Sequence, residues 1–369
     1  MKLKMLFCHF DLGHGGAEKV LVNLLKFIDY EKYEVTLYLL FKHGVNLPFV
    51  PSNVRVLYMF NRKPFIGITI LLKLISPKLL HRLLIKDKYD IEIAYLEGAP
   101  TRIISGCPNQ STKLFSWVHT KAGKGFFRPY RSLREAHAAY SRFNKIIFVS
   151  EAAKLAFQSK TTWDHLTYSV CHNVMDINDI LLKSNEHINF QLHSSSINMC
   201  SVGKLVENKG YPRLIRILGE IRKNVNLDWK LFILGEGSMR HVLENQILEY
   251  GLQDHVFLLG YDTNPYKYVA KMDVLLCASY NEGYSTAVVE SLLVGTPVIT
   301  TDCVGMSEIL GDSGAGIIVE NSYEGLRDII EELLLGKLDV QSLKLNAVER
   351  ARYFQKSNII EFEDVISGN

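Results

Sequence analysis

Short runs of apolar, β-favouring residues alternate with longer amphipathic stretches along the whole chain. The runs are residues 4–10, 33–40, 54–59, 90–96, 113–119 and 145–150 in the first half, and 197–203, 230–235, 255–260, 273–279, 296–301 and 315–320 in the second. Strands buried on both faces read as continuous apolar runs, and helices between them indicate parallel βαβ units. The pattern therefore predicts two successive α/β domains with parallel sheets.

The polar stretch KSNEHINFQLHSSS, residues 183–196, interrupts this alternation and is the predicted border between the domains. A chain of 369 residues that is 47% hydrophobic is long enough to bury two cores. We therefore expect one domain in residues 1–183 and a second in residues 184–345. Residues 346–369 read as helix.

Charge is divided unevenly between the two halves. Residues 1–175 hold 25 Lys and Arg against 12 Asp and Glu, and residues 176–369 hold the remaining 17 and 27 of the 42 basic and 39 acidic residues. A basic half joined to an acidic half indicates different partners for the two domains, although drift of surface charge would give the same split.

The six cysteines are dispersed, form no C-x-x-C pair and lie mostly in apolar runs. Buried, reduced thiols explain this pattern better than disulfides or zinc ligands. The N-terminal apolar run is too short for a signal peptide and lacks a cleavage-type sequence, so it is predicted to be the first strand. These features favour a cytoplasmic protein.

Residues 62–88 depart from the strand–helix pattern because they are strongly apolar yet rich in Lys and Arg, with Asp87 as the one acid. Pro77 and the charges within the segment argue against a membrane span. One interpretation is a basic amphipathic surface that lies on an anionic membrane. The other is a helical hairpin that covers the first sheet, with lysines that reach out to water. The two are compatible.

The stretch NEGYSTAVVE places Glu282 and Glu290 on either side of a turn of small residues. The preceding run predicts a strand and the following one a helix that begins near Ser285 or Thr286, so the turn lies where open α/β sheets bind ligands. Helix N-terminal amides suit a phosphate, and Gly283 permits close approach of the backbone. A carboxylate this near a bound phosphate would be repelled unless it faces sugar hydroxyls instead. A nucleotide sugar supplies both groups, a phosphate for the helix amides and hydroxyls for the carboxylates. The alternative is that a Glu in the first turn of a helix compensates the helix dipole.

Several segments resemble glycosyltransferase family 4, the large retaining GT-B family. E-x7-E in EGYSTAVVE, followed by SLLVGTPVITTDCVGMSEIL, resembles the family signature. SVGKLVENKGYPRLI, FILGEGSMRHVLENQILEYGLQDHVFLLGY and GHGGAEKVLVNLL resemble three further family segments. The match is dense over residues 198–320. It implies a GT-B fold, with an acceptor-binding Rossmann-like domain in 1–183, a donor-binding one in 184–345 facing it across a cleft, and a C-terminal helix in 346–369 that crosses back to the first.

The resemblance also implies roles for residues of the second half. Lys204 and Lys209 are expected to contact the donor diphosphate. Lys204 stands where the family most often has Arg; lysine keeps the positive charge but cannot make the bidentate contact of a guanidinium. A solvated loop is the alternative for both. Glu290 is expected to bind the ribose, and Glu282 to lie by the donor sugar and its reacting carbon. The other expected donor contacts are Gly203, Gly235, Glu236, Gly237, Tyr261, Gly283, Tyr284, Ser285, Thr286 and Ala287, with Tyr261 near the base.

In the first half, Gly15 and Gly16 form a turn after the first strand that is expected to approach the donor phosphates. Glu18 lies on the following helix, where it faces the acceptor or serves as a first-turn acid. His119 ends a predicted strand and matches a histidine that family members place near the donor sugar. A lone histidine is more often structural, but this position favours a role in catalysis, together with Glu282 and the two lysines.

The stretch TKAGKGFFRPYRSLR, residues 120–134, has five basic residues among glycines and aromatics. We call it the basic lip. It is expected to be a mobile cover over the acceptor, in which Lys121, Lys124 and Arg128 meet a lipid pyrophosphate.

The expected chemistry needs no metal and no cofactor. Many glycosyltransferases hold a metal through Asp-x-Asp, which this sequence lacks, whereas two lysines and a helix N-terminus converge on the proposed phosphate. The resemblance implies retention of anomeric configuration through a front-face, oxocarbenium-like transition state, in which the leaving phosphate takes the acceptor proton. The geometry of two domains suggests that they close before chemistry.

The favoured function is transfer of a hexose or N-acetylhexosamine from a nucleotide sugar, preferably a UDP-sugar, to a lipid-linked saccharide in bacterial surface polysaccharide synthesis, on the inner face of the cell membrane. One alternative is a non-catalytic GT-B protein that binds a membrane or a partner. Another is a GT-B nucleotide-sugar epimerase, which would turn over donor without acceptor. Nucleic-acid binding is disfavoured because the basic residues are dispersed rather than set among aromatics along a groove.

Overall fold

The computed structural model describes residues 2–62, 67–123, 125–192, 196–223, 228–354 and 358–367. It divides into two compact units: residues 1–175 with 357–369, and residues 176–356. The border falls earlier than the polar stretch 183–196 suggested. The reason is helix α7 (Ile177–Ser184), which packs on α10 (Tyr266–Val269) and α11 (Thr286–Leu293) of the second unit.

The C-terminal return also begins later than residue 346. Helix α14 (Val340–Phe354) still packs on α11, and only α15 (Asn358–Ser367) belongs to the first unit. In α15 the ring of Phe362 lies 6.1 Å from that of Phe7 and 5.6 Å from that of Trp117. Glu361 accepts the backbone N–H of His172 at 2.8 Å. The last helix is therefore part of the first unit's core.

The first unit is a seven-stranded parallel sheet in the order β3-β2-β1-β4-β5-β6-β7. Its strands are β1 Leu3–His9, β2 Tyr33–Phe41, β3 Arg55–Phe60, β4 Ile91–Ala94, β5 Lys113–Val118, β6 Lys145–Phe148 and β7 Tyr168–Val170. Its helices are α1 Gly16–Phe27, α2 Ile68–Leu74, α3 Pro77–Leu84, α4 Ala99–Ile104, α5 Leu133–Tyr140, α6 Glu151–Gln158 and α15, with a 3-10 turn at Leu47–Phe49.

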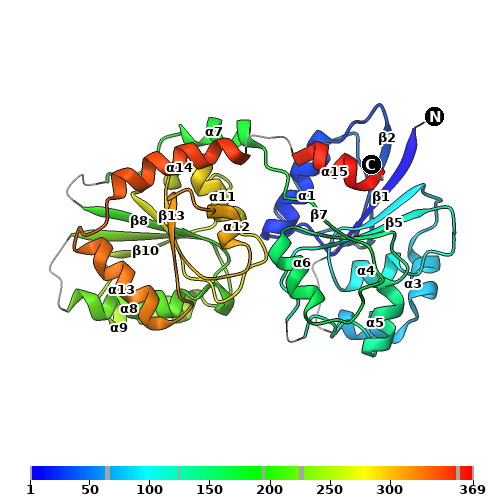
Figure 1. Ribbon diagram of the computed structural model, residues 1–369, viewed down its shortest axis with the longest axis horizontal. Coiled ribbons are helices and arrows are strands. Elements are labelled where there is room, and N and C mark those ends of the chain that lie inside the picture. The colour runs from blue at the N-terminus through cyan, green and yellow to red at the C-terminus, as the bar shows by residue number, and fades with distance from the viewer. Residues whose placement is uncertain are drawn as a thin grey trace. The chain divides into compact units, whose positions relative to one another are not determined.

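The second unit has six parallel strands in the order β10-β9-β8-β11-β12-β13. They are β8 Ile197–Val202, β9 Trp229–Leu234, β10 Val256–Gly260, β11 Val274–Cys277, β12 Val298–Thr301 and β13 Gly316–Val319. The remaining helices are α8 Tyr211–Arg222, α9 Arg240–Glu249, α12 Met306–Leu310 and α13 Tyr323–Leu334, with a 3-10 turn η2 at Glu207–Lys209. Helices α8, α9 and α13 cover one face of this sheet, and α7, α11 and α14 cover the other (Figure 1).

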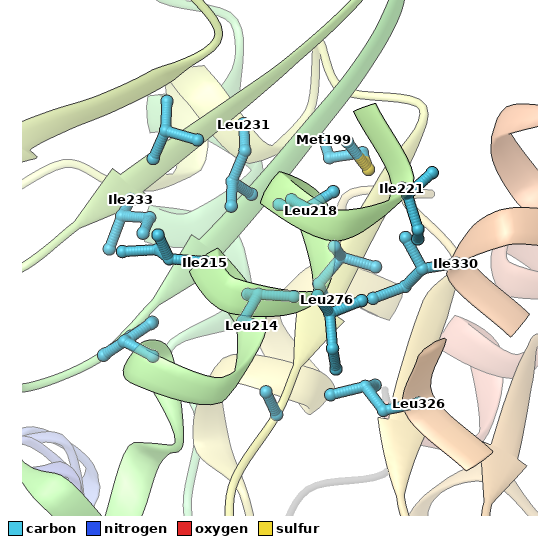
Figure 2. Close-up of a cluster of buried hydrophobic side chains, with 14 of the residues drawn as sticks. Met199, Leu214, Ile215, Leu218, Ile221, Leu231, Ile233, Leu276, Leu326 and Ile330 are labelled. Carbon is cyan, nitrogen blue, oxygen red and sulfur yellow. The ribbon is translucent and has the colours of Figure 1, made fainter. Parts of the chain in front are cut away.

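The strands coincide with the predicted apolar runs, except that β7 was not predicted. It is a three-residue edge strand whose residues are only partly buried, so it leaves no apolar run in the sequence. The core of the second unit explains why the other runs are continuous (Figure 2). Leu231 and Leu276 of the sheet meet Leu214 and Leu218 of α8, and all four are fully buried. A strand covered by helices on both faces has no side chain directed to water.

Both sheets change strand order beside their first strand. In the first unit β1 lies between β2 and β4, and in the second β8 lies between β9 and β11. Connections from such neighbouring strands leave in opposite directions, so a crevice opens at their carboxyl ends, and open α/β sheets bind ligands there. Gly15 and Gly16 come after β1, Lys204 and Lys209 after β8, and Glu282 after β11, whereas His119 follows β5.

The basic apolar segment 62–88 forms the short helices α2 and α3 in the part that the structure describes. Ser76 caps α3, accepting the N–H of Leu79 at 3.4 Å, and Pro77 occupies the first turn, where no N–H is needed. Five apolar side chains of this hairpin are exposed: Ile70, Leu71, Leu74, Leu79 and Leu83. Among the described residues, no helix is long and apolar enough to span a bilayer.

Candidate functional site

Helix α11 of the second unit begins where the sequence predicted, with Ser285 at the N-cap and Thr286 as its first residue. Within the described structure the Ser285 hydroxyl makes no capping bond. The first amides of a helix have no intrahelical acceptor, and the dipole makes this end positive. The end of α11 therefore offers backbone donors to an anion, beside the carboxyl end of β11.

Glu282 and Lys209 form an ion pair at this edge. Lys209 Nζ lies 2.6 Å from Glu282 Oε1, which also accepts the Ser279 hydroxyl at 2.6 Å. The Glu282 and Lys209 side chains are 12% and 24% exposed, so both are shielded from water but reachable. Burial lowers the pKa of Lys209, but Glu282 outweighs it and the pKa is raised. Lys209 is thus held as a cation at the place expected for the donor phosphates.

The loops after β8 and β11 are fastened to each other, which fixes this pair. Asn208 Nδ2 donates to Asn281 O at 2.7 Å, and Tyr280 N donates to Asn208 O at 2.8 Å. Gly210 follows Lys209 with φ +68°, and a Cβ there would lie 1.9 Å from the carbonyl oxygen of Ala278. A glycine is required at this crossing.

Glu290 is buried on α11, and Tyr266 OH donates to its Oε1 at 3.3 Å. Burial, followed by the nearby Glu290 carboxylate, raises the pKa of Tyr266 well above its usual value, so the phenol stays protonated and able to donate. This bond orients the carboxylate expected to bind ribose hydroxyls. Tyr261, the residue expected near the base, follows β10 and is exposed.

Packing of the backbone explains the glycines after β9. A Cβ at Gly235 would lie 2.0 Å from Gly203 O, and one at Gly237 would lie 2.3 Å from Leu205 O. Both therefore let the loop after β9 press against the loop after β8. Glu236 between them is exposed and pairs with Arg240 at 2.6 Å. These three residues have structural roles that need no ligand.

The other expected donor residues lie along the same edge. Gly203 ends the strand region of β8, where a Cβ would come within 3.1 Å of Tyr211 OH, and Lys204 follows it with an exposed side chain. Gly283, Tyr284 and Ala287 flank the start of α11; Gly283 is buried and the other two are half-buried. The structure thus collects the donor residues predicted in 203–209 and 282–290 around β8 and β11.

Arg213 is a residue of this edge that sequence reasoning missed. Its guanidinium donates to the carbonyls of Ala278 and Ser279 at 2.7 and 3.1 Å, and lies 4.0 Å from the centre of the Tyr280 ring. Burial lowers its pKa. The available signal was a basic residue on the buried face of α8. Arg213 ties the end of β11 to α8 and so positions the turn that carries Glu282.

In the first unit His119 follows β5 at the corresponding edge. Its backbone N–H donates to Glu97 Oε2 at 3.0 Å, and its ring lies 5.0 Å from that of Tyr95. Burial, assisted by nearby His9, lowers the pKa of His119 to about 3, so the ring is neutral. The ring bonds the Tyr95 backbone carbonyl, whereas its buried Nε2 has no partner within the described residues. The donating nitrogen is therefore Nδ1, and Nε2 is an acceptor.

His9, the last residue of β1, was not predicted as a site residue but has the same character. It is 1% exposed, and its Nδ1 lies 2.6 Å from the carbonyl oxygen of Asp11, which can only accept. Burial lowers the pKa of His9, so its Nε2 is also a bare acceptor, buried and unpartnered in the described chain. Two neutral histidines thus offer acceptors near the switch point. A histidine at the end of the first apolar run was the signal.

Gly15 is the N-cap of α1 and Gly16 its first residue. The Glu18 carboxylate folds back over this turn, because a Cβ at Gly15 would lie 1.9 Å from Glu18 Oε2. An acid in this position complements the helix dipole, which is one of the two roles expected for Glu18. A side chain at Gly15 would displace the Glu18 carboxylate from this position.

The basic lip is fastened to α2 and to the core. Lys73 Nζ donates to Arg128 O at 3.0 Å, and Arg131 Nε donates to Lys73 O at 2.9 Å. The rings of Phe126 and Phe127 lie 5.8 and 6.0 Å from that of Phe157. The side chains of Lys121 and Arg128 are exposed, whereas Lys124 lies outside the described residues.

A cluster with metal-ligating side chains lies elsewhere in the first unit. Ligand atoms of His81, Glu92 and Cys107 are within 4.8 Å of one another, and all three residues are buried. His81 Nε2 bonds Glu92 Oε2 at 2.8 Å, and Cys107 Sγ donates to Glu92 Oε1 at 3.5 Å. Burial opposes charge on His81, but Cys107 and Glu92 raise its pKa to about 9. The ligand atoms of this cluster therefore bond one another, through a His81–Glu92 ion pair and the Cys107 thiol. All six cysteines are buried free thiols, as predicted.

The second unit matches a family model. Residues 184–352 match the family described as glycosyl transferases group 1, and this range contains the Lys209–Glu282 pair and Glu290. The donor-side edge described above therefore lies within the part of the chain that matches this family.

The chain is similar to curated proteins from a bacterium and from an archaeon. It is 36% identical over 196 residues to an N-acetylgalactosamine-N,N'-diacetylbacillosaminyl-diphospho-undecaprenol 4-alpha-N-acetylgalactosaminyltransferase of Campylobacter jejuni, covering 52% of this chain and 50% of the relative. It is 34% identical to an uncharacterized glycosyltransferase of Methanocaldococcus jannaschii, covering 55% and 51%. The chain thus spans about half the length of these two relatives.

A longer match is to a second Campylobacter jejuni protein, a GalNAc-alpha-(1->4)-GalNAc-alpha-(1->3)-diNAcBac-PP-undecaprenol alpha-1,4-N-acetyl-D-galactosaminyltransferase, at 24% identity over 97% of this chain and 96% of the relative. Among solved structures, Anabaena HepE in complex with UDP and glucose matches with a TM-score of 0.75 at 18% identity, covering both chains fully. Sucrose-phosphate synthase of Thermosynechococcus elongatus matches at 0.79 and 15%, over 100% and 99%. These likenesses confirm the predicted GT-B fold class of two Rossmann-like domains.

Proposed function

We propose that this protein transfers a hexose or N-acetylhexosamine from a UDP-sugar to a lipid-linked saccharide acceptor in the synthesis of a bacterial surface polysaccharide. The observation that carries the proposal is the Lys209–Glu282 pair, held at 2.6 Å beside the N-terminus of α11 within a glycosyltransferase domain. A shielded cation and a helix N-terminus suit a diphosphate leaving group. The buried Glu290 suits the hydroxyls of a ribose.

In the proposed reaction the bond between the anomeric carbon and the UDP oxygen breaks, and an acceptor oxygen bonds to the same face of that carbon. Because the new bond forms on the face that UDP leaves, the anomeric configuration is retained. The acceptor proton passes to the departing phosphate oxygen, so no group on the protein is consumed. Lys209, Lys204 and the amides of α11 neutralise the charge that grows on UDP. Glu282 holds Lys209 in place and lies by the sugar. The proposal includes neither a metal nor a cofactor.

The acceptor is proposed to bind the basic first unit. Both Campylobacter relatives are named for acceptors linked through diphosphate to undecaprenol, and HepE was crystallised with UDP, which supports both substrate classes. His119 and His9 offer acceptors to sugar hydroxyls, and Lys121 and Arg128 offer charge to a diphosphate. Lys124 and Glu18 are proposed to act at the same site.

The same proposal places the protein on the cytoplasmic face of the cell membrane. Exposed leucines of α2 and α3 lie among Lys73, Lys78 and Arg82, a combination that binds anionic lipid. The protein would be peripheral, since its acceptor is anchored in the bilayer but its donor is water-soluble.

The test is release of nucleotide from UDP-, GDP- and ADP-sugars in the presence of EDTA, with and without a membrane lipid extract. We expect slow release from one UDP-sugar alone and faster release with lipid, both lost in Glu282→Ala. Glu349→Ala, at the exposed Arg352–Glu349 ion pair of α14, is the control and should retain activity. Dependence on a divalent metal would contradict the metal-free reaction. Conversion of donor to a free sugar epimer would instead indicate an epimerase.

A further inference from the structure

A pocket of about 170 Å³ lies in the first unit beside the acceptor edge. It is bounded by α2, α3, the start of α4 and the basic lip. Leu72, Leu80, Leu96, Pro100 and Pro129 supply its apolar wall. The function proposed above assigns no ligand to it.

The charged side chains that line the pocket form hydrogen bonds with other groups of the protein. Glu97 accepts the His119 N–H and, at 2.5 Å, the Thr120 hydroxyl. The terminal nitrogens of Arg102 donate to the carbonyls of Leu72 and Ile75, at 2.5 and 2.7 Å. Within the described residues the buried Nε of Arg102 is left without a partner. The wall thus offers hydrocarbon contact but few hydrogen bonds, which a sugar ring would need.

The surroundings of the pocket join apolar and cationic groups. Pro129 of the wall follows Arg128, whose exposed side chain adds charge to the lip, and Lys73 of the wall is tied to the Arg128 carbonyl. On the outer side, Leu74 of α2 is 69% exposed and Leu83 of α3 is 51% exposed. A ligand that fits this setting has a hydrocarbon part beside a strong negative charge.

We propose that the pocket binds the first part of the hydrocarbon chain of a polyprenyl-diphosphate acceptor, with the diphosphate beside Arg128 and Lys73. The inference rests on the proposed function and extends it from the head group to the chain. An apolar cavity of about 150 Å³ takes up a six-carbon ring, so this pocket has room for about one five-carbon isoprene unit. Glu97, shared by the pocket and the His119 backbone, links this subsite to the acceptor edge.

The test compares the dissociation constants of farnesyl diphosphate and inorganic pyrophosphate, measured calorimetrically on the full chain below the micelle concentration. Burial of one isoprene unit is expected to make farnesyl diphosphate bind at least about tenfold more tightly. Ala99→Leu extends a side chain into the pocket and should abolish this difference while leaving pyrophosphate affinity unchanged. Ala138→Leu, the same change at an exposed position of α5, should retain the difference.

Leu80→Phe is the second variant, should Ala99→Leu fail to fold, and is expected to have the same effect. Equal binding of the two ligands by the wild type, or an unchanged preference in both pocket variants, would overturn the proposal. The proposal would also be overturned if a short-chain phosphatidylglycerol bound as tightly as farnesyl diphosphate and displaced it, because the pocket would then accept any lipid chain. Since these readouts need no turnover, a protein that binds farnesyl diphosphate selectively but transfers no sugar would refute the proposed function and leave the pocket standing.

Discussion

At the scale of single residues, the molecule combines charged and neutral groups whose states are set by their surroundings. Lys209 remains a cation because Glu282 outweighs its burial, whereas His119 and His9 remain neutral because burial dominates. The charged groups suit a diphosphate, and the neutral rings suit sugar hydroxyls. Sequence reasoning predicted Lys209, Glu282 and His119 as site residues from their places in motifs. It missed His9 and Arg213 because their settings appear only in the fold. The buried Nε2 of His9 has no partner within the described residues, and the Arg213 guanidinium donates to backbone carbonyls at the end of β11.

His119 predicts a loss of stability in mild acid. Its folded pKa, about 3, is below its usual value of 6.5, so its stability contribution is complete above pH 6.5 and is lost as pH falls toward the folded pKa. Between pH 7.5 and 5.5 it should account for about 1 kcal/mol of lost unfolding free energy. Urea titrations at both pH values should show that His119→Gln loses less stability than the wild type. An identical loss would show that the ring is protonated in the folded state.

His9 is predicted to position a sugar through its Nε2 acceptor. His9→Leu should lower kcat/KM for transfer about tenfold, the value of one or two hydrogen bonds, while the Kd for UDP alone stays unchanged. His9→Gln keeps an acceptor and should recover part of the loss. A parallel fall in UDP affinity would indicate that the residue serves only to hold the fold.

At the scale of elements, the strands were predictable because both sheets are covered on both faces, which makes each strand a continuous apolar run. The exception, β7, is short and half-buried at a sheet edge. The border between the units was not predictable from composition, because α7 has polar surroundings in sequence yet packs on α10 and α11 in space. Likewise, nothing in the helical pattern of residues 340–367 indicates that α14 stays with the second unit while α15 fills the core of the first.

The crossing of the loops after β8 and β11 gives a prediction with a matched control. Gly210 and Gly336 have φ of +68° and +67°, but a Cβ at Gly210 would strike the Ala278 carbonyl whereas one at Gly336 meets nothing within 4 Å. Gly336→Ala should cost about 1 kcal/mol of unfolding free energy from backbone strain alone. Gly210→Ala should cost more, on the order of 3 kcal/mol, and should weaken UDP binding. Equal costs in urea unfolding would show that the crossing is not tight.

At the scale of the whole molecule, the charge split underlies the proposal that the basic unit faces lipid and the lipid-linked acceptor. The variant Lys78→Gln with Arg82→Gln should lower partitioning onto vesicles containing phosphatidylglycerol at least about tenfold, since each basic residue contributes about 1 kcal/mol near an anionic surface. Lys223→Gln with Lys337→Gln removes two exposed charges from the second unit and should have little effect. Sedimentation with vesicles at two salt concentrations measures both. Binding that is insensitive to salt and to the first pair of changes would refute an electrostatic contact through α3.

The central claim is that Lys209, held by Glu282, supports metal-free transfer to a lipid-linked acceptor. The most direct measurement is transfer of labelled sugar from the UDP-sugar to a polyprenyl-diphosphate saccharide in EDTA, comparing the wild type with Lys209→Met and Lys209→Arg. Removal of one preorganised group that stabilises the leaving charge should lower kcat by about 10²–10³, and Arg should restore part of it. Near-normal kcat in Lys209→Met would contradict the account.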